Sequence, residues 1–272
     1  MLAHPNCKIN LGLQVVGRRP DGYHNLQTLF VPIPLADDLS ISPATAFAFR
    51  QSGIAIGGDP EQNLVVRAYR LLQADFPSLV GPVEIELCKH IPFGAGLGGG
   101  SADAAFALKL IAQLFGLPLS AAQLEGYASR LGADCAFFIQ NRAAYATGIG
   151  DLLQPVDLDL TPYHILLVKP EDAVSTAEAY RNLRVDFDAP RPDLREAVKA
   201  PIAQWRESIV NDFEASVFPA HPHIAQCKET LYRSGAAYAS MTGSGAALFA
   251  LYDELPIPLP SFPFPVEVLY AE

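Results

Sequence analysis

The amino-acid sequence predicts an α+β fold, because segments with two kinds of hydrophobic periodicity are mixed along it. Some runs alternate apolar and polar residues, which is typical of strands, and others repeat apolar residues every three or four positions, which is typical of helices. The two kinds do not follow the strict strand–helix–strand order of a parallel α/β sheet, and the sequence has no internal repeat or heptad pattern. With 272 residues, 50% of them hydrophobic, the chain can form one large domain or two moderate ones.

The N-terminal part is predicted to consist mainly of strands. Residues 7–17 alternate apolar and polar side chains, and residues 26–33 and 38–49 have the composition of further strands. Residues 63–76 then place apolar side chains at helical spacing, with Asn63 in a position suited to cap the first turn.

A strand and two helices are predicted in the middle of the chain. Residues 82–92 alternate and end at a proline, after which a glycine-rich loop leads into a helix over 101–116. This helix is apolar on most sides, so we expect it to be buried. A second helix over 120–132 begins with a capping-box pattern. Asp134 therefore lies just beyond its end, on loop backbone.

The C-terminal part is predicted to mix strands with looser segments. Residues 163–170 form an apolar strand, and residues 180–205, rich in Pro, Arg and Asp, form a loose connection before a helix. Residues 236–252 have the pattern of a strand, a glycine turn and a strand. The proline-rich stretch 255–265 fits a partner-binding polyproline segment or an extended edge beside the last strand, and we favour the edge.

Composition excludes several classes of protein. A formal net charge of −10 disfavours binding to nucleic acid or to an anionic membrane surface, because both need a basic face. The N-terminus lacks the pattern of a signal peptide, and no apolar run reaches the length of a membrane span. The cysteines show no metal-binding or redox spacing. We therefore expect a cytoplasmic protein with reduced thiols, acting on a small molecule, as a monomer or weak homodimer.

The densest signal is the stretch PFGAGLGGGSADAA at 92–105. Its glycines match the dinucleotide-binding pattern G-x-G-x-x-G, but the acidic residue expected about 20 positions later is missing, since position 119 is Leu119. The chain contains no Gly-Lys pair, which excludes a Walker A loop. What remains is a tight turn or, as we favour, a loop whose N–H groups bind phosphate at the start of a helix.

Four blocks of the sequence resemble one family. The stretch 92–105 is similar to the nucleotide-phosphate loop of the GHMP kinases, which include galactokinase, homoserine kinase and mevalonate kinase. Residues 8–30, KINLGLQVVGRRPDGYHNLQTLF, resemble the opening signature of those members that act on a cytidine-diphosphate-linked methylerythritol. The blocks LGADCAFF at 131–138 and MTGSGAALF at 241–249 follow in the family's order. The resemblance covers most of the chain.

This resemblance implies a two-domain GHMP kinase. It implies an N-terminal ATP-binding domain over 1–157, with the fold of ribosomal protein S5 domain 2, and a ferredoxin-like C-terminal domain over 158–272. The implied reaction moves the γ-phosphoryl group of ATP to the 2-hydroxyl of the cytidine-linked methylerythritol, in the non-mevalonate route to isoprenoids. The alternatives are a kinase of the homoserine or mevalonate type and a nucleotide-binding regulator without turnover.

The resemblance also assigns roles to residues. By position alone Asp134 is more often a turn former, but it matches the family's catalytic aspartate, and Lys8 is its predicted charge partner. The predicted ATP-binding residues are Asn63, which the helix-cap role alone would also explain, and Pro92, Phe93, Gly94, Ala95, Gly96, Leu97, Gly98, Gly99, Gly100, Ser101 and Ala102.

Five residues are predicted to bind the acceptor substrate. Tyr23 and Tyr180 match aromatic residues on the two sides of the cytosine, and His24 matches the residue that reads its polar edge. Asn10, two positions after Lys8 and so on the same strand face, is predicted to bind the polyol or diphosphate. Thr176 is a nearby hydroxyl donor. Arg18 and Arg19 fit the substrate diphosphate and a solvated turn equally well, and residues 242–246 fit either a turn against the site or a simple hairpin.

The expected cofactor is ATP with Mg²⁺. Many relatives carry two serines where this chain has Ser101 and Ala102, which removes one hydroxyl near the phosphates. No protein-held metal site is predicted, because His221, His223 and Cys227 match no zinc-ligand spacing. Mg²⁺ is therefore expected to arrive with ATP.

Overall fold

The computed structural model describes residues 1–55 and 57–271. The chain divides into two compact units. The first unit contains residues 1–8, 34–93 and 98–142, and the second contains residues 9–33, 94–97 and 143–272. The division at residue 157 expected from the sequence stays a prediction, and its last residue, Glu272, lies outside the described residues.

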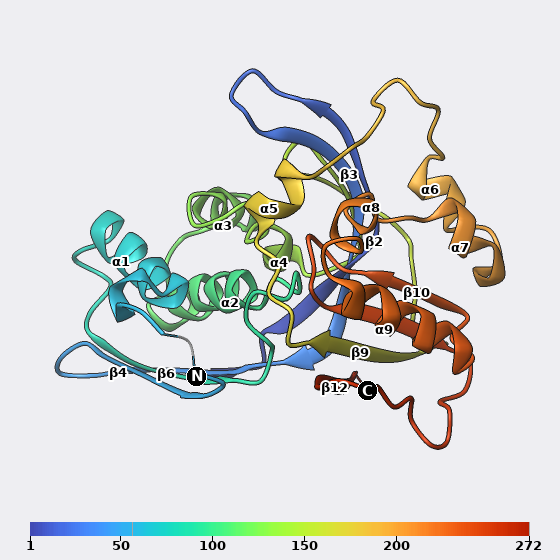
Figure 1. The fold of residues 1–272 in the computed structure, drawn as a ribbon. Helices are drawn as coiled ribbons and strands as arrows, with labels where there is room; N and C mark the ends of the chain where they lie inside the picture. The colour runs from blue at the N-terminus through green and yellow to red at the C-terminus, as the bar shows by residue number, and fades with distance from the viewer. Residues whose placement is uncertain (56, 272) are drawn as a thin grey trace. The chain divides into compact units, whose positions relative to one another are not determined.

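The first unit is a sheet covered by helices. Its sheet has the strand order β1-β4-β6-β5, in which β5 pairs with β6 in parallel and the other neighbours are antiparallel. Figure 1 shows α1 and α2 on one side of β4 and β6. The elements of this unit are β1 (Leu2–Ala3), β4 (Asp38–Pro43), β5 (Ala48–Gly53), the 3₁₀ helix η1 (Pro60–Gln62), α1 (Leu64–Asp75), β6 (Val83–Lys89), α2 (Gly99–Leu114), α3 (Ala121–Ser129) and α4 (Phe137–Gln140).

Helix α2 is the centre of the first unit. It packs on α1, α3, α4 and β4, and most of its residues from Ala102 to Ala112 are buried, as its apolar composition predicted. The helix begins at Gly99, two residues before the expected Ser101. The reason is that Gly98 adopts a left-handed conformation and so ends the loop there.

The second unit contains two four-stranded sheets. Their strand orders are β2-β3-β7-β8 and β10-β11-β9-β12, and α9 packs on β9, β10 and β11. The elements include β2 (Asn6–Arg18) and β3 (His24–Ala36), of which residues 6–8 and 34–36 belong to the first unit. The others are β7 (Ala144–Thr147), β8 (Leu152–Pro155), β9 (His164–Pro170), α5 (Thr176–Arg181), α6 (Leu194–Ala197), the 3₁₀ helix η2 (Ile202–Gln204), α7 (Trp205–Ser208), α8 (Glu214–Val217), α9 (Pro222–Arg233), β10 (Tyr238–Met241), β11 (Leu248–Tyr252) and β12 (Val266–Ala271).

The proline-rich stretch differs from the prediction. Residues 255–265 contain no strand, and the edge of the sheet is instead formed by β12, which pairs with β9 rather than with β11. Proline has no N–H to donate to a neighbouring strand, so the pairing begins only after the last proline of the run. The α+β class itself is confirmed. In the described residues no helix is both long and apolar enough to cross a membrane.

Candidate active site

The glycine-rich loop contains backbone that other residues would not fit. Gly94, Gly96 and Gly98 all have positive φ, at 67°, 75° and 71°. A Cβ on Gly98 would also lie 3.2 Å from Cε of Lys8 and 3.2 Å from the Phe138 ring. Gly98 therefore serves two purposes: it gives the left-handed turn that starts α2, and it leaves room for the lysine side chain.

The middle of the loop contacts a second glycine turn within the second unit. A Cβ on Gly96 would lie 2.3 Å from the carbonyl oxygen of Thr242, and one on Gly243 would lie 3.1 Å from Cα of Gly96. The Thr242 hydroxyl also lies 3.3 Å from the Gly96 carbonyl oxygen, to which it donates. Residues 242–246 thus form the hairpin turn between β10 and β11, and the same turn contacts the glycine-rich loop at Gly96.

The turn that contains Thr242 is fixed by an asparagine that the sequence analysis did not single out. The Asn211 side-chain amide donates to the carbonyl oxygens of Met241 and Gly243, at 2.8 Å each, and its oxygen accepts the N–H of Phe213 at 3.0 Å. Asn211 is buried and forms an isolated parallel β-bridge with Leu13, outside the named strands. Its role depends on contacts with residues 30 positions away, so local pattern gave no signal.

A buried ion cluster lies beneath the start of the loop. The Lys89 ammonium bonds to Asp37 and, at 2.7 Å, to Asp103 Oδ2. Asp37 also accepts the backbone N–H groups of His90 and Ile91, at 2.6 and 2.8 Å. One carboxylate therefore holds both the lysine and the segment that leads to Pro92. The sequence does indicate this cluster, because Lys89 falls on the inward face of an alternating strand, where a lysine requires a buried counter-charge.

The cluster changes the acid–base behaviour of its members. Burial raises the pKa of the Asp103 carboxyl to about 7, against the opposing charge of Lys89. Burial alone would lower the pKa of the Lys89 ammonium, but the Asp103 and Asp37 carboxylates outweigh it and raise that pKa. Asp103 Oδ1 is buried without a hydrogen-bond partner in the described structure. Lys89 therefore keeps its charge, while Asp103 binds a proton more readily than an ordinary aspartate.

The two predicted catalytic residues lie together in the first unit. Lys8 Nζ is 3.5 Å from Asp134 Oδ2, and the lysine side chain is 4% exposed while the aspartate side chain is 34% exposed. Asp134 lies in the turn between α3 and α4, as expected for loop backbone after a helix. A buried ammonium beside a partly accessible carboxylate can orient and charge-balance a base that a substrate reaches.

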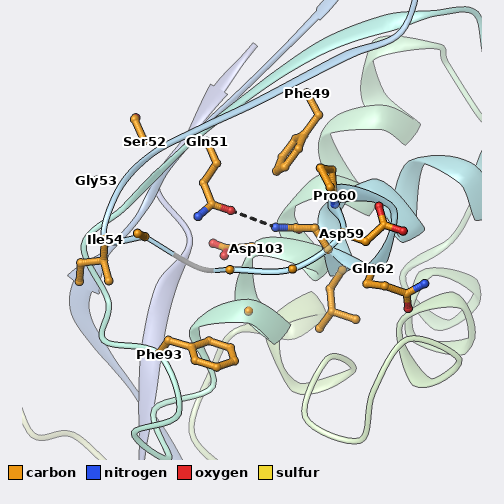
Figure 2. Close-up of a pocket in the computed structure, with 16 residues that line it drawn as sticks. Phe49, Gln51, Ser52, Gly53, Ile54, Asp59, Pro60, Gln62, Phe93 and Asp103 are labelled. Carbon is orange, nitrogen blue, oxygen red and sulfur yellow. Dashed lines mark hydrogen bonds between the residues drawn. The ribbon is translucent and has the colours of Figure 1, made fainter. Parts of the chain in front are cut away.

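A pocket of about 550 Å³ lies beside the start of α2 in the first unit (Figure 2). Phe49, Ile54 and Phe93 supply apolar walls, while Gln51 and Asp103 supply polar groups. Such a mixture of apolar walls and a few polar groups is typical of a small-molecule site.

Three predicted ATP-binding residues, Asn63, Phe93 and Gly100, line this pocket. Asn63 caps α1 by accepting the Val65 N–H at 2.9 Å, and its amide donates to Gln51 at 3.4 Å. The structure therefore shows its capping role and places it at the pocket as well. The loop residues from Gly94 to Leu97 belong to the second unit.

The predicted acceptor-binding residues lie in the second unit. The rings of His24 and Tyr180 stack at 4.8 Å with 20° between their planes, and Tyr23 is 63% exposed. The Thr176 hydroxyl lies 3.0 Å from that of Ser244. Burial, together with the charge of Arg18, lowers the pKa of His24, so its ring is neutral near pH 7 and can both donate and accept.

Asn10 is part of the framework of the second unit. It is 2% exposed, its side-chain amide donates to Thr28 at 3.0 Å, and its backbone N–H donates to the Thr242 hydroxyl at 3.0 Å. Arg19 pairs with Asp21 at 3.0 Å on the surface, as a solvated turn would. The structure thus joins His24 to Tyr180 and Asn10 to the glycine turn, while the proposed ligand contacts of all these residues stay predictions.

Comparisons with known proteins agree with the four sequence blocks. Residues 63–142 match the GHMP kinases N terminal domain, and residues 194–256 match the GHMP kinases C terminal domain. The chain is 52% identical over 257 residues to a 4-diphosphocytidyl-2-C-methyl-D-erythritol kinase of Bacteroides thetaiotaomicron, covering 93% of this chain and 92% of that relative. It is 51% identical over 254 residues to the enzyme of the same name from Parabacteroides distasonis, with the same coverage.

Solved structures show the same relationship. A crystal structure of 4-(cytidine 5'-diphospho)-2C-methyl-D-erythritol kinase matches with a TM-score of 0.80 at 34% identity, over 92% of this chain and 90% of that one. A Methanococcus jannaschii mevalonate kinase matches with a TM-score of 0.73 at 11% identity, over 99% and 97%, which shows the fold alone. The chain therefore belongs to the 4-diphosphocytidyl-2-C-methyl-D-erythritol kinases within the GHMP kinase family, and it is an ATP-dependent small-molecule kinase.

Proposed function

We propose that this chain transfers the γ-phosphoryl group of ATP to the 2-hydroxyl of 4-diphosphocytidyl-2-C-methyl-D-erythritol, a step in the non-mevalonate synthesis of isoprenoid precursors. The names of relatives 52% and 51% identical over almost the whole chain support this substrate. The structural observation that carries the proposal is the buried Lys8 beside the part-exposed Asp134. The cytoplasmic location and the monomeric or weakly dimeric state expected from the sequence stay predictions.

ATP is proposed to bind with its base in the pocket of the first unit. Asn63, Phe93 and Gly100 were predicted from the sequence, and all three line that pocket. The phosphates are then expected on the backbone N–H groups of residues 93–101, because Pro92 has no N–H and the Ala102 N–H donates to the Gly98 carbonyl oxygen at 2.9 Å. The first N–H groups of a helix have no acceptor within the helix, and the helix dipole adds positive potential at that end.

Mg²⁺ is expected to come with ATP, and its chemistry is to neutralise the charge of the phosphates. The part-exposed residue Ser101 offers a hydroxyl oxygen of the kind that fits such an ion. Position 102 is a fully buried alanine and supplies no hydroxyl. This chain therefore depends on phosphate and water oxygens for most of the ion's ligands.

In the proposed reaction Asp134 accepts the proton of the substrate hydroxyl as its oxygen attacks the γ-phosphorus. A new oxygen–phosphorus bond forms, the bond to the β-phosphate oxygen breaks, and ADP leaves. Lys8, 3.5 Å from Asp134, orients the carboxylate and balances negative charge on the transferred group. Because Lys8 is already buried and oriented, little reorganisation is needed during the reaction.

Cytosine recognition is assigned to the second unit. Tyr23, with an exposed ring, is proposed to stack on one face of the base, and Tyr180 on the other. The present 4.8 Å stack between His24 and Tyr180 leaves no space for a base, so the imidazole moves off that ring face and reads the base edge. Thr176 and Asn10 are the remaining proposed polar contacts.

Two other functions remain as alternatives. A homoserine-type or mevalonate-type kinase would share the fold, but it would have no use for the Tyr23–His24 pair and its stacking partner Tyr180. A nucleotide-binding regulator without turnover would have no need of a lysine buried against a carboxylate. Both are distinguished by measuring the products.

The first experiment is product analysis with three acceptors. Purified protein with ATP and Mg²⁺ is given the cytidine-linked methylerythritol, homoserine or mevalonate, and ADP and the phosphorylated product are quantified. We expect product from the cytidine-linked acceptor at a rate far above the other two. Preference for homoserine or mevalonate would reject the proposed substrate. If no ADP forms with any of the three acceptors, the result would support a nucleotide-binding regulator without turnover.

The second experiment tests the base. Asp134→Asn keeps the size of the side chain, so the fold and the melting temperature are expected to stay as in the wild type, while kcat falls by ~10²–10⁴-fold, the range that general-base catalysis contributes. Asp75→Asn is the control, because Asp75 is also an exposed acid paired with a cation, Arg130. Undiminished turnover of Asp134→Asn would remove Asp134 as the base.

A further inference from the structure

Four potential metal ligands from three strand segments share the outer face of the first unit's sheet. The register of the strands places Asp38 opposite Cys88. Ala3 is opposite Leu39, so the next residue, His4, falls beside Asp38. His90 follows Cys88 by two positions and therefore points to the same face. We call these residues the outer-face cluster: His4, Asp38, Cys88 and His90.

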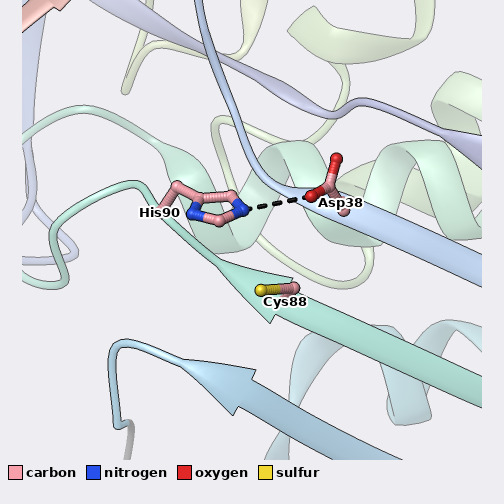
Figure 3. Close-up of side chains that lie close together, drawn as sticks. All are labelled: Asp38, Cys88 and His90. Atoms are coloured by element: carbon pink, nitrogen blue, oxygen red, sulfur yellow. Dashed lines mark hydrogen bonds and ion pairs between the residues drawn. The ribbon is translucent and has the colours of Figure 1, made fainter.

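Distances within the outer-face cluster are short. His90 Nε2 lies 3.1 Å from Asp38 Oδ2, and His4 Nδ1 lies 2.7 Å from Asp38 Oδ1. Ligand atoms of Asp38, Cys88 and His90 all lie within 4.8 Å of one another. Figure 3 shows the Cys88 sulfur beside the His90–Asp38 contact. The donor atoms of Asp38, Cys88 and His90 can therefore converge on one ion with only small changes of side-chain rotamer, and His4 contacts the same carboxylate through its other oxygen.

The cluster is reachable from solvent. Cys88 and Asp38 are half-buried, and His4 and His90 are exposed. The cluster also differs from a chance group of surface acids, because it combines two imidazoles, one thiol and one carboxylate. Imidazole, thiolate and carboxylate are the ligands that zinc takes in proteins, commonly four at a time in a tetrahedron.

We propose that Asp38, Cys88 and His90, with His4 as the fourth ligand, bind a divalent ion of the zinc class. Nitrogen and sulfur donors favour Zn²⁺, Co²⁺ or Ni²⁺ over Mg²⁺ and Ca²⁺, which require oxygen ligands. The site is therefore separate in chemistry from the Mg²⁺ that accompanies ATP. No local spacing in the sequence indicates this site, because its ligands are up to 86 positions apart, from residue 4 to residue 90.

An ion bound by the outer-face cluster would cross-link three segments of the first unit. Strand alternation puts Cys88 and His90 outside, whereas Lys89 between them points inside to Asp37 and Asp103. An ion outside would tie the N-terminal residue His4 and the start of β4 to the end of β6. The segment that leads into Pro92 is thereby held from both faces of the sheet.

Cobalt spectroscopy tests the site directly. Metal-free protein is titrated with Co²⁺, which shows d–d bands in a tetrahedral site and a near-ultraviolet charge-transfer band when a thiolate is a ligand. We expect one equivalent to bind with both signals, and Zn²⁺ to displace it. Cys88→Ser should lose the charge-transfer band. Asp38→Asn and His90→Gln should each weaken Co²⁺ binding by at least ~10-fold, since loss of a residue that only hydrogen-bonds to a metal ligand already lowers metal affinity by about that much.

His223→Gln is the matched control. His223 is also an exposed histidine beside an aspartate, Asp172, at 3.3 Å, so it reports adventitious binding by a surface histidine. Its variant should bind Co²⁺ as the wild type does. No saturable binding by the wild type, a charge-transfer band that survives Cys88→Ser, or equal weakening by His223→Gln and His90→Gln would each overturn the proposal.

A thermal-shift measurement provides a second readout that does not depend on colour. Zn²⁺ at a concentration well above its Kd should raise the melting temperature of the wild type and of His223→Gln, because an ion that binds the folded state stabilises it. The same Zn²⁺ should raise the melting temperature of Cys88→Ser and Asp38→Asn by clearly less, because their weaker binding stabilises the folded state less. An equal rise in all four proteins would place the ion elsewhere and overturn the assignment.

Discussion

Lys89 Nζ lies 2.7 Å from Asp103 Oδ2, and both side chains are almost completely buried, with 2% and 3% of their surfaces exposed. The lysine comes from the last position of β6 and the aspartate from the second turn of α2. Together with Asp37 they join strand, loop and helix by charge in a place where most proteins use apolar packing. A buried charge keeps its place only when it is paired, so this relationship should dominate the stability of the first unit.

Removing the cation should strongly destabilise the fold. Lys89→Met leaves Asp37 and Asp103 buried beside each other with no counter-charge, and we expect the free energy of unfolding to fall by about 3–5 kcal/mol, as for other broken buried ion pairs. Urea denaturation measures the change. Lys199→Met is the control, because the Lys199–Glu196 pair is exposed and such pairs contribute about 0–1 kcal/mol. Equal effects of the two substitutions would show that the buried cluster has no special role.

The raised pKa of Asp103 gives stability a defined pH dependence. The folded-state pKa is about 7 against a usual 3.8, so folding favours the protonated carboxyl. This contribution is complete below the unfolded pKa and is lost as the pH rises through the folded pKa. The free energy of unfolding of the wild type should therefore fall, relative to that of Asp103→Asn, as the pH rises from about 4 to about 7.

Urea denaturation at several pH values measures this difference. Asn at position 103 cannot titrate, so the difference between the two proteins isolates the contribution of this carboxyl. Parallel pH profiles for the wild type and Asp103→Asn would contradict the prediction.

Gly98 should be essential for activity beyond its effect on stability. In Gly98→Ala the new Cβ would meet Lys8 and Phe138 at 3.2 Å and displace the lysine, and misplacement by about 1 Å can lower kcat by ~10²-fold. Gly116→Ala is a matched control, since Gly116 also has positive φ, at 61°, but nothing lies within 4 Å of its Cβ position. Both variants should lose about 1–2 kcal/mol of stability from backbone strain, and kcat measurements should separate them.

The stacked pair His24 and Tyr180 should make ligand binding selective for cytosine. Burial and Arg18 lower the pKa of His24, so near pH 7 its neutral ring has one donor and one acceptor for the base edge. CMP should therefore raise the melting temperature more than UMP does. His24→Gln should reduce this difference without changing the KM for ATP. Equal shifts by CMP and UMP in the wild type would reject the cytidine assignment.

Much of the fold could be predicted from local pattern. Alternation in residues 82–92 predicted β6 and its inward face, and Asn63 and Ser120 cap helices as expected. The short elements were missed for a physical reason. Helix α4 and strands β7 and β8 have four residues each, too few to show a period, and they form because neighbouring strands or helices supply their contacts.

The site was predictable to a different extent. Lys8 and Asp134 came from family resemblance, and the structure places them 3.5 Å apart. Asn211 and Asp37 were missed, because their importance comes from hydrogen bonds to backbone distant in sequence, which no local spacing reveals. Lys89 could have been found, since a lysine at an inward position of an alternating strand requires a buried counter-charge.

The carboxylate of Asp37 has a thermodynamic consequence for nucleotide binding. Because it already accepts the N–H groups of His90 and Ile91, the approach to the glycine-rich loop is ordered before any ligand arrives. The conformational entropy of this segment was lost when the protein folded, so ATP bound on the loop as proposed would not have to offset it at the moment of association. Asp37 would therefore increase the affinity for the nucleotide by preorganising this segment, without contacting the nucleotide itself.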